Sequence, residues 1–494
     1  MVAGIAFLLR TLSLDTQSLW RDEIDAIRFS SWTMTELLAG LFQVGHNGPL
    51  FFLLLRPWRH LTGNSEFALR YPSALMGAAA IPLGFILARQ LGYSRRVGLL
   101  LSLLLATSPY LVWYGQEAKM YTLLLVLVML AFIAYLKALT TETKPSPSTR
   151  RISRQGIWWV TFVLATTLAF YTHILAPLMV LVYGAVALLH GSHLRRHWRG
   201  WLISMGYLTI PYLPLASWQL PLLLQGFQSG HPFYPLQEEI RILLQLYMSG
   251  VLRFLDPIAF NLFRFVFLFL FLAGLFLKNS HRPAGSHIAR WLTLAIWALL
   301  PPLTVYLISL RVPVFEDRYL IYITAAFYLL VAIGITLVRR YSPWLASLCL
   351  GLILTVNLMG IWQQQYHPIK ADFRAAAAYL AGQPTPPSPI MVHMPYLQHT
   401  LNYYYHQEYV LLEGLWTNGA KTEILVDLEM KALTADLTEL WLVVSEEAAW
   451  DNRSLIRAWL DKHATLASRT SFTRVEVYHY QFDRDSRVNS GALN

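Results

Sequence analysis

The chain contains few charged residues and a single cysteine. Asp, Glu, Lys and Arg make up only 14% of its 494 residues, whereas they make up about a quarter of an ordinary soluble domain. Hydrophobic residues account for 55%, so the composition excludes a soluble globular protein and predicts an integral membrane protein. Because Cys349 is alone and lies in an apolar run, an intramolecular disulfide, a CxxC metal site and a redox pair are all excluded.

Nucleotide-binding and hydrolase motifs are also missing. No GxGxxG, P-loop, HExxH or GxSxG pattern occurs at a plausible position, so the sequence does not support nucleotide binding or serine hydrolysis. The formal charge of +11 would suit a nucleic-acid partner, but the basic residues fall mainly in short loops between apolar runs. This distribution is typical of membrane topology, and we expect no nucleic-acid binding.

Apolar windows predict a polytopic helical bundle of about eleven spans. A span needs about 20 apolar residues, and the windows lie near residues 2–14, 69–89, 97–113, 120–139, 157–172, 174–190, 200–217, 258–277, 290–309, 319–338 and 343–362. The first is short, because a helix from Met1 to Leu14 covers roughly 21 Å of a core about 30 Å thick. Either the true start lies upstream or this helix enters the bilayer only partly. The N-terminus lacks a basic region and a cleavage site, so we expect this segment to stay in the membrane.

Basic residues predict the orientation of these spans. They gather in alternate loops, which should be cytoplasmic: Arg89, Arg95, Arg96, Lys144, Arg150, Arg151, Arg154, Arg195, Arg196, Arg199, Lys278, Arg282, Arg290, Arg339 and Arg340. The segments with chemical content, including the C-terminus, then share the opposite, extracytoplasmic face.

Two outward regions are more than connectors. Residues 15–68 contain TMTELLAGLFQ and PLFFLLLRPWRHL, which are too short to span twice and suit interfacial helices. Residues 363–494 alternate between helical and strand-like segments, which predicts a small extracytoplasmic α/β domain. We therefore divide the chain into a membrane domain, 1–362, and this C-terminal domain, 363–494.

The acidic pair Asp22 and Glu23, in SLWRDEIDA, is the first candidate for chemistry. Such carboxylates often do no more than hydrate an interfacial loop. However, the pair follows Trp20, an interfacial anchor, where partial desolvation would raise the pKa of a carboxylate towards that of a useful base. Because an Asp in this position can take a proton from an acceptor hydroxyl, we interpret the loop as the catalytic loop of a membrane enzyme.

A second cluster lies in SPYLVWYGQEAKMY, where Glu117, Lys119 and Tyr121 follow a helix break. Glu117 and Lys119 can simply solvate a turn between two spans. Alternatively, the cation and the amide of Gln116 in so short a turn can hold an anionic head group.

Arg318, in VFEDRYLIYIT, begins a span from the outside. It can snorkel to lipid phosphates, or it can grip a substrate phosphate in a bidentate fork, with Glu316 and Asp317 orienting it. His173 lies at an outward turn in FYTHIL, and His46 lies in the first outer loop, in HNGP. Either histidine, together with carboxylates, can hold a divalent metal, but no ligand spacing requires one.

These motifs together resemble a known family. SLWRDEIDA, HNGPLFFLLL with SEFALRYPSAL, SPYLVWYGQEAKMYTL, FYTHILAP, RYLIYITAAFYLL and KADFRAAAAYL follow one another over nearly the whole chain. They are similar to the landmarks of bacterial family 39 glycosyltransferases, which include the lipid A aminoarabinose transferases and are related to the protein O-mannosyltransferases. Lys119 departs from the pattern, since family members commonly have Arg there, and the HNGP loop often contains two prolines.

The resemblance implies a GT-C fold and glycosyl transfer from a sugar, hexose or pentose, carried on polyprenyl phosphate. It implies an inner-membrane protein with an extracytoplasmic active site, and a lipid, glycan or protein acceptor. The catalytic acidic residue of the family maps onto Asp22, with Glu23 as its partner. The donor head-group contacts map onto Glu117, Lys119, Tyr121 and Arg318, and we add His173 to them.

Other functions remain open. A transporter or lipid flippase would need ionisable residues in mid-span and two similar halves, whereas most charges here lie at span ends. A scaffold that binds glycans without turnover would leave the acidic and basic clusters unexplained. If the chain is a transferase, residues 218–257, with His231, Glu238 and Glu239, are the expected place for acceptor selectivity.

Overall fold

The computed structural model describes residues 1–40, 42–43, 47–141, 154–227, 229–251, 257–276, 284–419 and 421–482. The chain forms two compact units. The membrane unit comprises Met1–Leu14 and Phe29–Gln365, and the C-terminal unit comprises Asp15–Arg28 and Tyr366–Asn494. The expected loop 15–68 is therefore divided between the two units.

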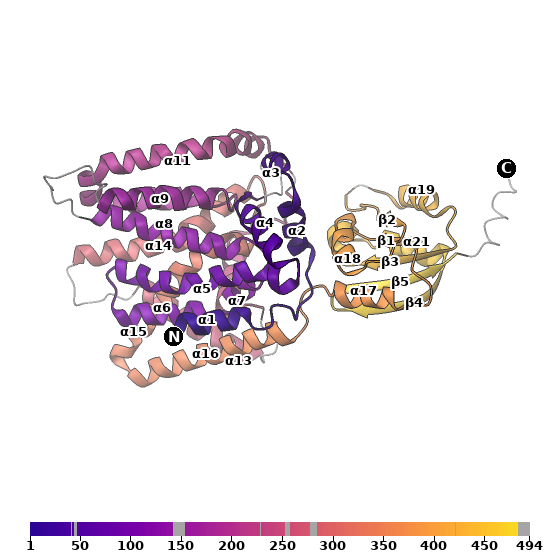
Figure 1. Cartoon of the computed structure of the whole chain (residues 1–494). Helices are drawn as coiled ribbons and strands as arrows, with labels where there is room; N and C mark the ends of the chain where they lie inside the picture. Colours follow the sequence, from indigo (N-terminus) through magenta and orange to yellow (C-terminus); the bar gives the residue numbers. More distant parts are fainter. Residues whose placement is uncertain are drawn as a thin grey trace. The chain divides into compact units, whose positions relative to one another are not determined.

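All regular secondary structure among the described residues of the membrane unit is helical. Its helices are α1 (Val2–Thr11), the end of α2 (Arg21–Ser31), α3 (Met34–Gly40), α4 (Leu50–Thr62), α5 (Glu66–Gln90), α6 (Arg95–Thr107), α7 (Pro109–Gly115), α8 (Tyr121–Thr140), α9 (Arg154–Phe170), α10 (Leu178–Leu189), α11 (Gly191–Gln225), α12 (Leu236–Ser249), α13 (Pro257–Phe276), α14 (Ala284–Ser309), the 3-10 helix η1 (Asp317–Ile323), α15 (Thr324–Tyr341) and α16 (Pro343–Tyr366). Helices α5, α8, α9 and α11 pack in succession (Figure 1).

The eleven expected windows lie mainly on helical residues, but 97–113 is divided between α6 and α7, and 319–338 between η1 and α15. The expected number of spans is not confirmed. By length and composition, five described helices can cross a membrane, or six if α6 and α7 form one broken span. Helices α1 and α10 are apolar but shorter, as is the stretch Phe260–Phe276 within α13. The expected interfacial segments form the short helices α3 and α4. The chain is an integral membrane protein whose spans differ widely in length.

A buried arginine stabilises the break between α6 and α7, which bend by 57°. In an uninterrupted helix the carbonyl of Leu105 would accept from residue 109, but Pro109 has no N–H. The guanidinium of Arg10 supplies the missing donors, with Nη2 at 2.9 Å from the Leu105 oxygen and Nη1 at 3.0 Å from the Ala106 oxygen. Arg10 therefore joins α1 to the broken span.

The space for this guanidinium exists because two neighbouring residues are glycines. A β-carbon on Gly77 would lie 2.8 Å from Nε of Arg10, and one on Gly115 would lie 3.2 Å from its Cδ. Two amides also satisfy the carbonyls at the end of α1. Nε2 of Gln116 donates to Leu12 at 2.9 Å, and Nε2 of Gln365 donates to Leu9 at 2.7 Å. The short first helix thus has internal partners for its last turn.

The C-terminal unit contains a mixed five-stranded sheet of order β2-β1-β3-β5-β4. Its elements are α17 (Phe373–Ala381), β1 (Ile390–Val392), the 3-10 helix η2 (Pro395–Leu397), α18 (Gln398–Tyr404), β2 (Leu411–Glu413), α19 (Glu423–Thr434), β3 (Glu439–Val444), α20 (Glu447–Trp450), α21 (Leu455–His463), β4 (Thr465–Phe472) and β5 (Val475–Gln481). Strand β1 is parallel to β2 and β3, while β5 is antiparallel to β3 and β4.

Apolar cores cover both faces of this sheet. Because successive strand residues point to opposite faces, Ile390 and Val392 pack with α17 and α18, whereas Met391 packs with α19 and α21. The sequence did not predict β4, because this edge strand is mostly exposed and lacks an apolar pattern. The predicted architecture, a helical membrane bundle with a small α/β region, is confirmed.

We expect Arg10→Met to destabilise the membrane unit. The substitution leaves the Leu105 and Ala106 carbonyls buried without their donor, and each such group raises the free energy of the folded state by about 1–3 kcal/mol. Thermal unfolding in detergent should therefore begin at a lower temperature. The matched control is Arg96→Met, since Arg96 is exposed on α6. Equal unfolding midpoints for the two variants would contradict this role of Arg10.

Candidate active site

The acidic pair lies at the start of α2, in the C-terminal unit. The side chain of Glu23 is fully buried, and its Oε2 is 2.9 Å from Nζ of Lys370, which is 5% exposed. Asp22 lies beside this pair, with Oδ1 3.6 Å from Nε of Arg21 and 14% of its side chain exposed. Glu23 is thus held in an internal ion pair, whereas Asp22 keeps some access.

Hydrogen bonds attach the segment before the pair to the same unit. Nε2 of Gln17 donates to the His367 carbonyl at 2.6 Å, and the Leu19 amide donates to the Tyr404 hydroxyl at 2.7 Å. Nη2 of Arg374 donates to the Asp15 carbonyl at 2.7 Å. These contacts explain why residues 15–28, although early in the chain, fold with its C-terminal part.

Glu117 and Lys119 lie in the turn between α7 and α8 of the membrane unit. Both are buried, at 1% and 7% exposure, so they do not simply solvate the turn. The Lys119 amide donates to the Glu117 carbonyl at 2.7 Å, and the Ser73 hydroxyl of α5 donates to the Lys119 carbonyl at 2.9 Å. The turn therefore has a defined backbone that holds two opposite charges inside the protein.

Arg318 is placed by the 3-10 helix η1. Its Cζ lies 5.9 Å from the ring centroid of Tyr121 and 5.9 Å from that of Tyr319, within reach of a cation–π attraction. Its Nε is 3.9 Å from Oε2 of Glu316, whose Oε1 is 3.2 Å from Nδ1 of His231. The guanidinium is thus held between aromatic rings and a carboxylate.

Asp317, next to Arg318 in the chain, is bound by two tyrosine hydroxyls. The hydroxyl of Tyr114 donates to Oδ2 of Asp317 at 2.9 Å, and the hydroxyl of Tyr110 donates to its carbonyl at 3.0 Å. The ring of Tyr114 also lies 5.3 Å from that of Tyr121, which directly follows the turn. Tyr114 therefore connects the turn that holds Glu117 to the segment that holds Arg318.

His173 joins the same cluster. Its ring centroid lies 4.7 Å from that of Tyr319 and 6.3 Å from that of Tyr121. Burial, together with the charge of Arg318, lowers the pKa of His173 to about 3, so the ring is neutral at pH 7. Its Nδ1 accepts from the Leu175 amide at 3.2 Å, which places the proton on Nε2.

Nε2 of His173 has no hydrogen-bond partner among the described residues. A buried N–H without a partner is rare in folded proteins, and here it can serve a bound oxygen atom. In this tautomer Nε2 has no lone pair for a metal ion, so the ring is arranged as a donor. His46, the other metal candidate, lies outside the described residues.

An apolar cavity of about 220 Å³ adjoins this cluster. His231 and Tyr319 line it, and its other walls come mainly from the segment after His173, the end of α11 and the residues around Val314. Apolar side chains predominate: Ile174, Leu175, Pro177, Leu178, Trp218, Leu220, Leu222, Leu223, Phe227, Ile308 and Val314. Arg318 and its aromatic neighbours therefore border a cavity whose walls suit a hydrocarbon chain.

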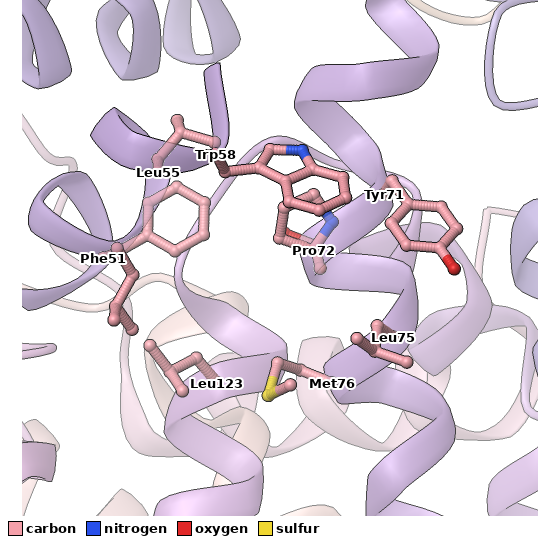
Figure 2. A pocket seen from close by; sticks show the side chains of 10 residues that line it. Phe51, Leu55, Trp58, Tyr71, Pro72, Leu75, Met76 and Leu123 are labelled. Carbon is pink, nitrogen blue, oxygen red and sulfur yellow. The ribbon is translucent and has the colours of Figure 1, made fainter. Parts of the chain in front are cut away.

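A second cavity, of about 160 Å³, lies between α4, α5 and α8. Figure 2 shows Phe51, Trp58, Met76 and Leu123 around its open centre. Trp58 stacks on Tyr71, with ring centroids 5.5 Å apart. Because no carboxylate, histidine, lysine or arginine is among the residues that line this cavity, it is not a candidate for the chemistry.

Glu239 is a buried carboxylate that the sequence marked only for acceptor selectivity. It lies on α12 and is fully buried, and neither of its carboxylate oxygens has a hydrogen-bond partner among the described residues. Burial raises the pKa of Glu239 to about 7. Glu238, next to it, is bound to Arg241 with its Oε2 2.7 Å from Nε. Glu239 therefore faces the protein interior, whereas Glu238 lies towards the surface.

The predicted residues thus fall into two groups. Tyr121, His173 and Arg318 form one aromatic and cationic cluster, and Glu117 and Lys119 lie in the turn just before Tyr121. Asp22 and Glu23 belong to the C-terminal unit. Sequence reasoning missed Lys370 and Tyr319, although Tyr319 follows Arg318 in the quoted motif and Lys370 opens KADFRAAAAYL.

Known proteins share part of this sequence and its fold. Residues 46–218 match the family model of dolichyl-phosphate-mannose-protein mannosyltransferases. No curated protein sequence matches the chain. The fold is similar to that of ArnT from Cupriavidus metallidurans, with a TM-score of 0.59, 15% identity and 97% of each chain covered. ArnT has also been solved bound to undecaprenyl phosphate, with a TM-score of 0.58 to this chain.

Two other solved structures share the fold at low identity. The oligosaccharyltransferase of Archaeoglobus fulgidus matches with a TM-score of 0.53 and 13% identity, over 98% of this chain and 73% of its own. The mycobacterial arabinofuranosyltransferase AftD matches with a TM-score of 0.52 and 14% identity, over 98% of this chain and 40% of its own. The predicted resemblance is therefore confirmed: this chain has the GT-C glycosyltransferase fold and resembles ArnT and the protein O-mannosyltransferases.

Proposed function

We propose that this protein is a membrane glycosyltransferase that moves a sugar from a polyprenyl-phosphate donor to an acceptor hydroxyl. The observation that carries the proposal is the cluster of Arg318, His173 and Tyr121 beside an apolar cavity. Such a donor has an anionic phosphate attached to a hydrocarbon chain, and it requires both features in one place. ArnT, which has the same fold, has been solved bound to undecaprenyl phosphate.

The proposed role of the basic residues is to stabilise the leaving phosphate. When the bond between the anomeric carbon and the phosphate oxygen breaks, negative charge grows on that phosphate. The guanidinium of Arg318 and the ammonium of Lys119 attract the growing charge, and this attraction is stronger in the transition state than in the bound substrate. The Nε2–H of His173 is a neutral donor that can bind a phosphate or sugar oxygen.

Asp22 is the proposed general base. It takes the proton from the acceptor hydroxyl as that oxygen attacks the anomeric carbon opposite the phosphate, so the centre is inverted. Glu23, which is held by Lys370, positions the start of α2. The proposed location is the inner membrane of a bacterium, with the reaction on the extracytoplasmic face. The face is inferred from the basic residues in the opposite loops, and the inner membrane from the resemblance to bacterial family 39 glycosyltransferases.

Substitution of the base tests this proposal. Purified protein in lipid nanodiscs is given radiolabelled polyprenyl-phosphate sugars and an envelope extract, and label transfer is followed. Because general base catalysis contributes about 10²–10⁴-fold, Asp22→Asn should slow transfer by at least about 100-fold.

Asp25→Asn is the matched control, since Asp25 lies on the same helix and pairs with Arg28 at 2.9 Å. It should transfer label at nearly the wild-type rate. Equal transfer by Asp22→Asn and wild type would exclude Asp22 as the base. If the wild type transferred label from none of the donors, the proposal that the protein is a glycosyltransferase would be contradicted.

Arg318→Lys tests the phosphate contact. Lysine keeps the charge but lacks the planar fork. Since a hydrogen bond to a charged group contributes about 1.5–3 kcal/mol, we expect kcat/KM for the donor to fall by about 10- to 100-fold. Arg241→Lys, on the exposed face of α12, should leave kcat/KM unchanged. An unchanged value for Arg318→Lys would show that the fork is not used.

We also propose that the segment around α12 selects the acceptor. The burial of Glu239 in this segment can be tested through its raised pKa. Between the ordinary carboxyl pKa, 4.5, and about 7, the folded protein binds more protons than the unfolded chain. The unfolding midpoint should therefore decrease as pH rises through this window and level off above it. Glu239→Gln should remove this slope, and Glu238→Gln should keep it. A slope that persists in Glu239→Gln would assign it to another group.

A further inference from the structure

Three side chains of the C-terminal unit lie together at the end of strand β1. His393 directly follows β1, Glu447 begins α20, and Asp451 directly follows α20. Each offers one donor atom, and these atoms all lie within 4.8 Å of one another. An imidazole with two carboxylates is a donor set typical of a divalent metal ion.

His393 is the least satisfied member of the group. Its side chain is fully buried, and neither ring nitrogen has a hydrogen-bond partner among the described residues. Its closest ionic contact is between Nε2 and Oδ2 of Asp451, at 3.6 Å, which is too long for a hydrogen bond. Because buried polar atoms nearly always have partners, this ring calls for a further ligand.

Asp451 is fixed as an anion by the start of α21. Its Oδ1 accepts from the Leu455 amide and its Oδ2 from the Ile456 amide, both at 2.9 Å, and the Thr417 hydroxyl also donates to Oδ1. These three donors favour the charged form of the carboxylate. The carboxylate therefore stays charged in the interior.

Glu447 contributes one open oxygen. Its Oε2 is 3.1 Å from Nη2 of Arg457, which orients the carboxylate, whereas its Oε1 is buried and has no hydrogen-bond partner among the described residues. Arg457 is itself held by the Tyr478 hydroxyl, at 2.9 Å from Nη1. The second carboxylate is thus positioned by an outer residue, as metal ligands usually are.

We propose that His393, Glu447 and Asp451 bind a divalent cation of the Zn²⁺ class, which joins the end of β1 to α20 and α21. A tetrahedral ion with bonds of about 2.1 Å separates its donor atoms by roughly 3.4 Å, so the group must contract by little more than an ångström. Glu447, the least buried of the three, can supply this movement. The nitrogen ligand favours Zn²⁺ over Mg²⁺ or Ca²⁺.

A simpler arrangement accounts for less of the structure. A protonated His393 paired with Asp451 would satisfy one ring nitrogen. It would leave Oε1 of Glu447 buried without a partner. A cation satisfies an imidazole nitrogen, Oε1 of Glu447 and the charge of Asp451 together, and it neutralises two neighbouring carboxylates.

The test measures metal directly in the full-length protein. Tag-free protein in lipid nanodiscs is stripped with a chelator, given Zn²⁺ or Mg²⁺, passed over a desalting column and analysed for metal by mass spectrometry. We expect one Zn²⁺ per chain and a higher unfolding midpoint with Zn²⁺ than with Mg²⁺. Equal midpoints with the two ions, or no retained Zn²⁺, would overturn the proposal.

Glu447→Gln is the informative variant. It keeps the contact between His393 and Asp451 and the cap of α21, so the unit should still fold. Since even outer-shell partners contribute about 10- to 100-fold to metal affinity, loss of a ligand should weaken Zn²⁺ binding by about 100-fold or more. His393→Gln should lose the ion as well.

His479→Gln is the matched control. His479 also pairs with a carboxylate in the same sheet, with its Nε2 2.9 Å from Oε2 of Glu439, but it lies outside the group. This variant should bind Zn²⁺ as the wild type does. Wild-type Zn²⁺ affinity in Glu447→Gln, or equal loss in His479→Gln, would assign the ion to another place and overturn the proposal.

Discussion

The hydrogen bonds from Arg10 to the broken span set the arrangement of the membrane unit. A proline in a span leaves a carbonyl without a donor, and no water in the bilayer core can replace it. The chain solves this problem with a guanidinium from its first helix, placed in the space that Gly77 and Gly115 leave. The break then directs α7 away from the axis of α6, so that α7 ends at the turn of Glu117 and Lys119.

The same turn leads to the cationic cluster. Tyr114, at the end of α7, bonds to Asp317, and Tyr121, at the start of α8, faces Arg318 and His173. The turn between α7 and α8 thereby meets the segment around Arg318, which lies nearly 200 residues later. Tyr114, Tyr121 and Tyr319 make these contacts. Arg318 is held on fixed aromatic surfaces, so little side-chain entropy remains to be lost when an anion binds.

The C-terminal unit has a similar dependence on one internal charge pair. Breaking a buried ion pair by removing one partner destabilises a protein by about 3–5 kcal/mol, so the pair of Glu23 and Lys370 firmly joins α2 to the segment before α17. This pair changes how the acidic motif is understood. Of the two carboxylates, Glu23 is held in this ion pair, and Asp22 is the one that we propose as the base.

The sequence by itself determined the membrane class, the apolar helices, the α/β alternation of residues 363–494 and the motifs that we propose to carry the chemistry. Composition and periodicity are local properties, and each can be read within about 20 residues. Only the tertiary structure decided the partners: Lys370 for Glu23, the Leu105 carbonyl for Arg10, and Tyr319 for His173. It also added β4, whose exposed edge needs no apolar pattern, and the group around His393. These contacts join residues far apart in the chain, and they form because burial leaves each polar group only the partners that the fold brings to it.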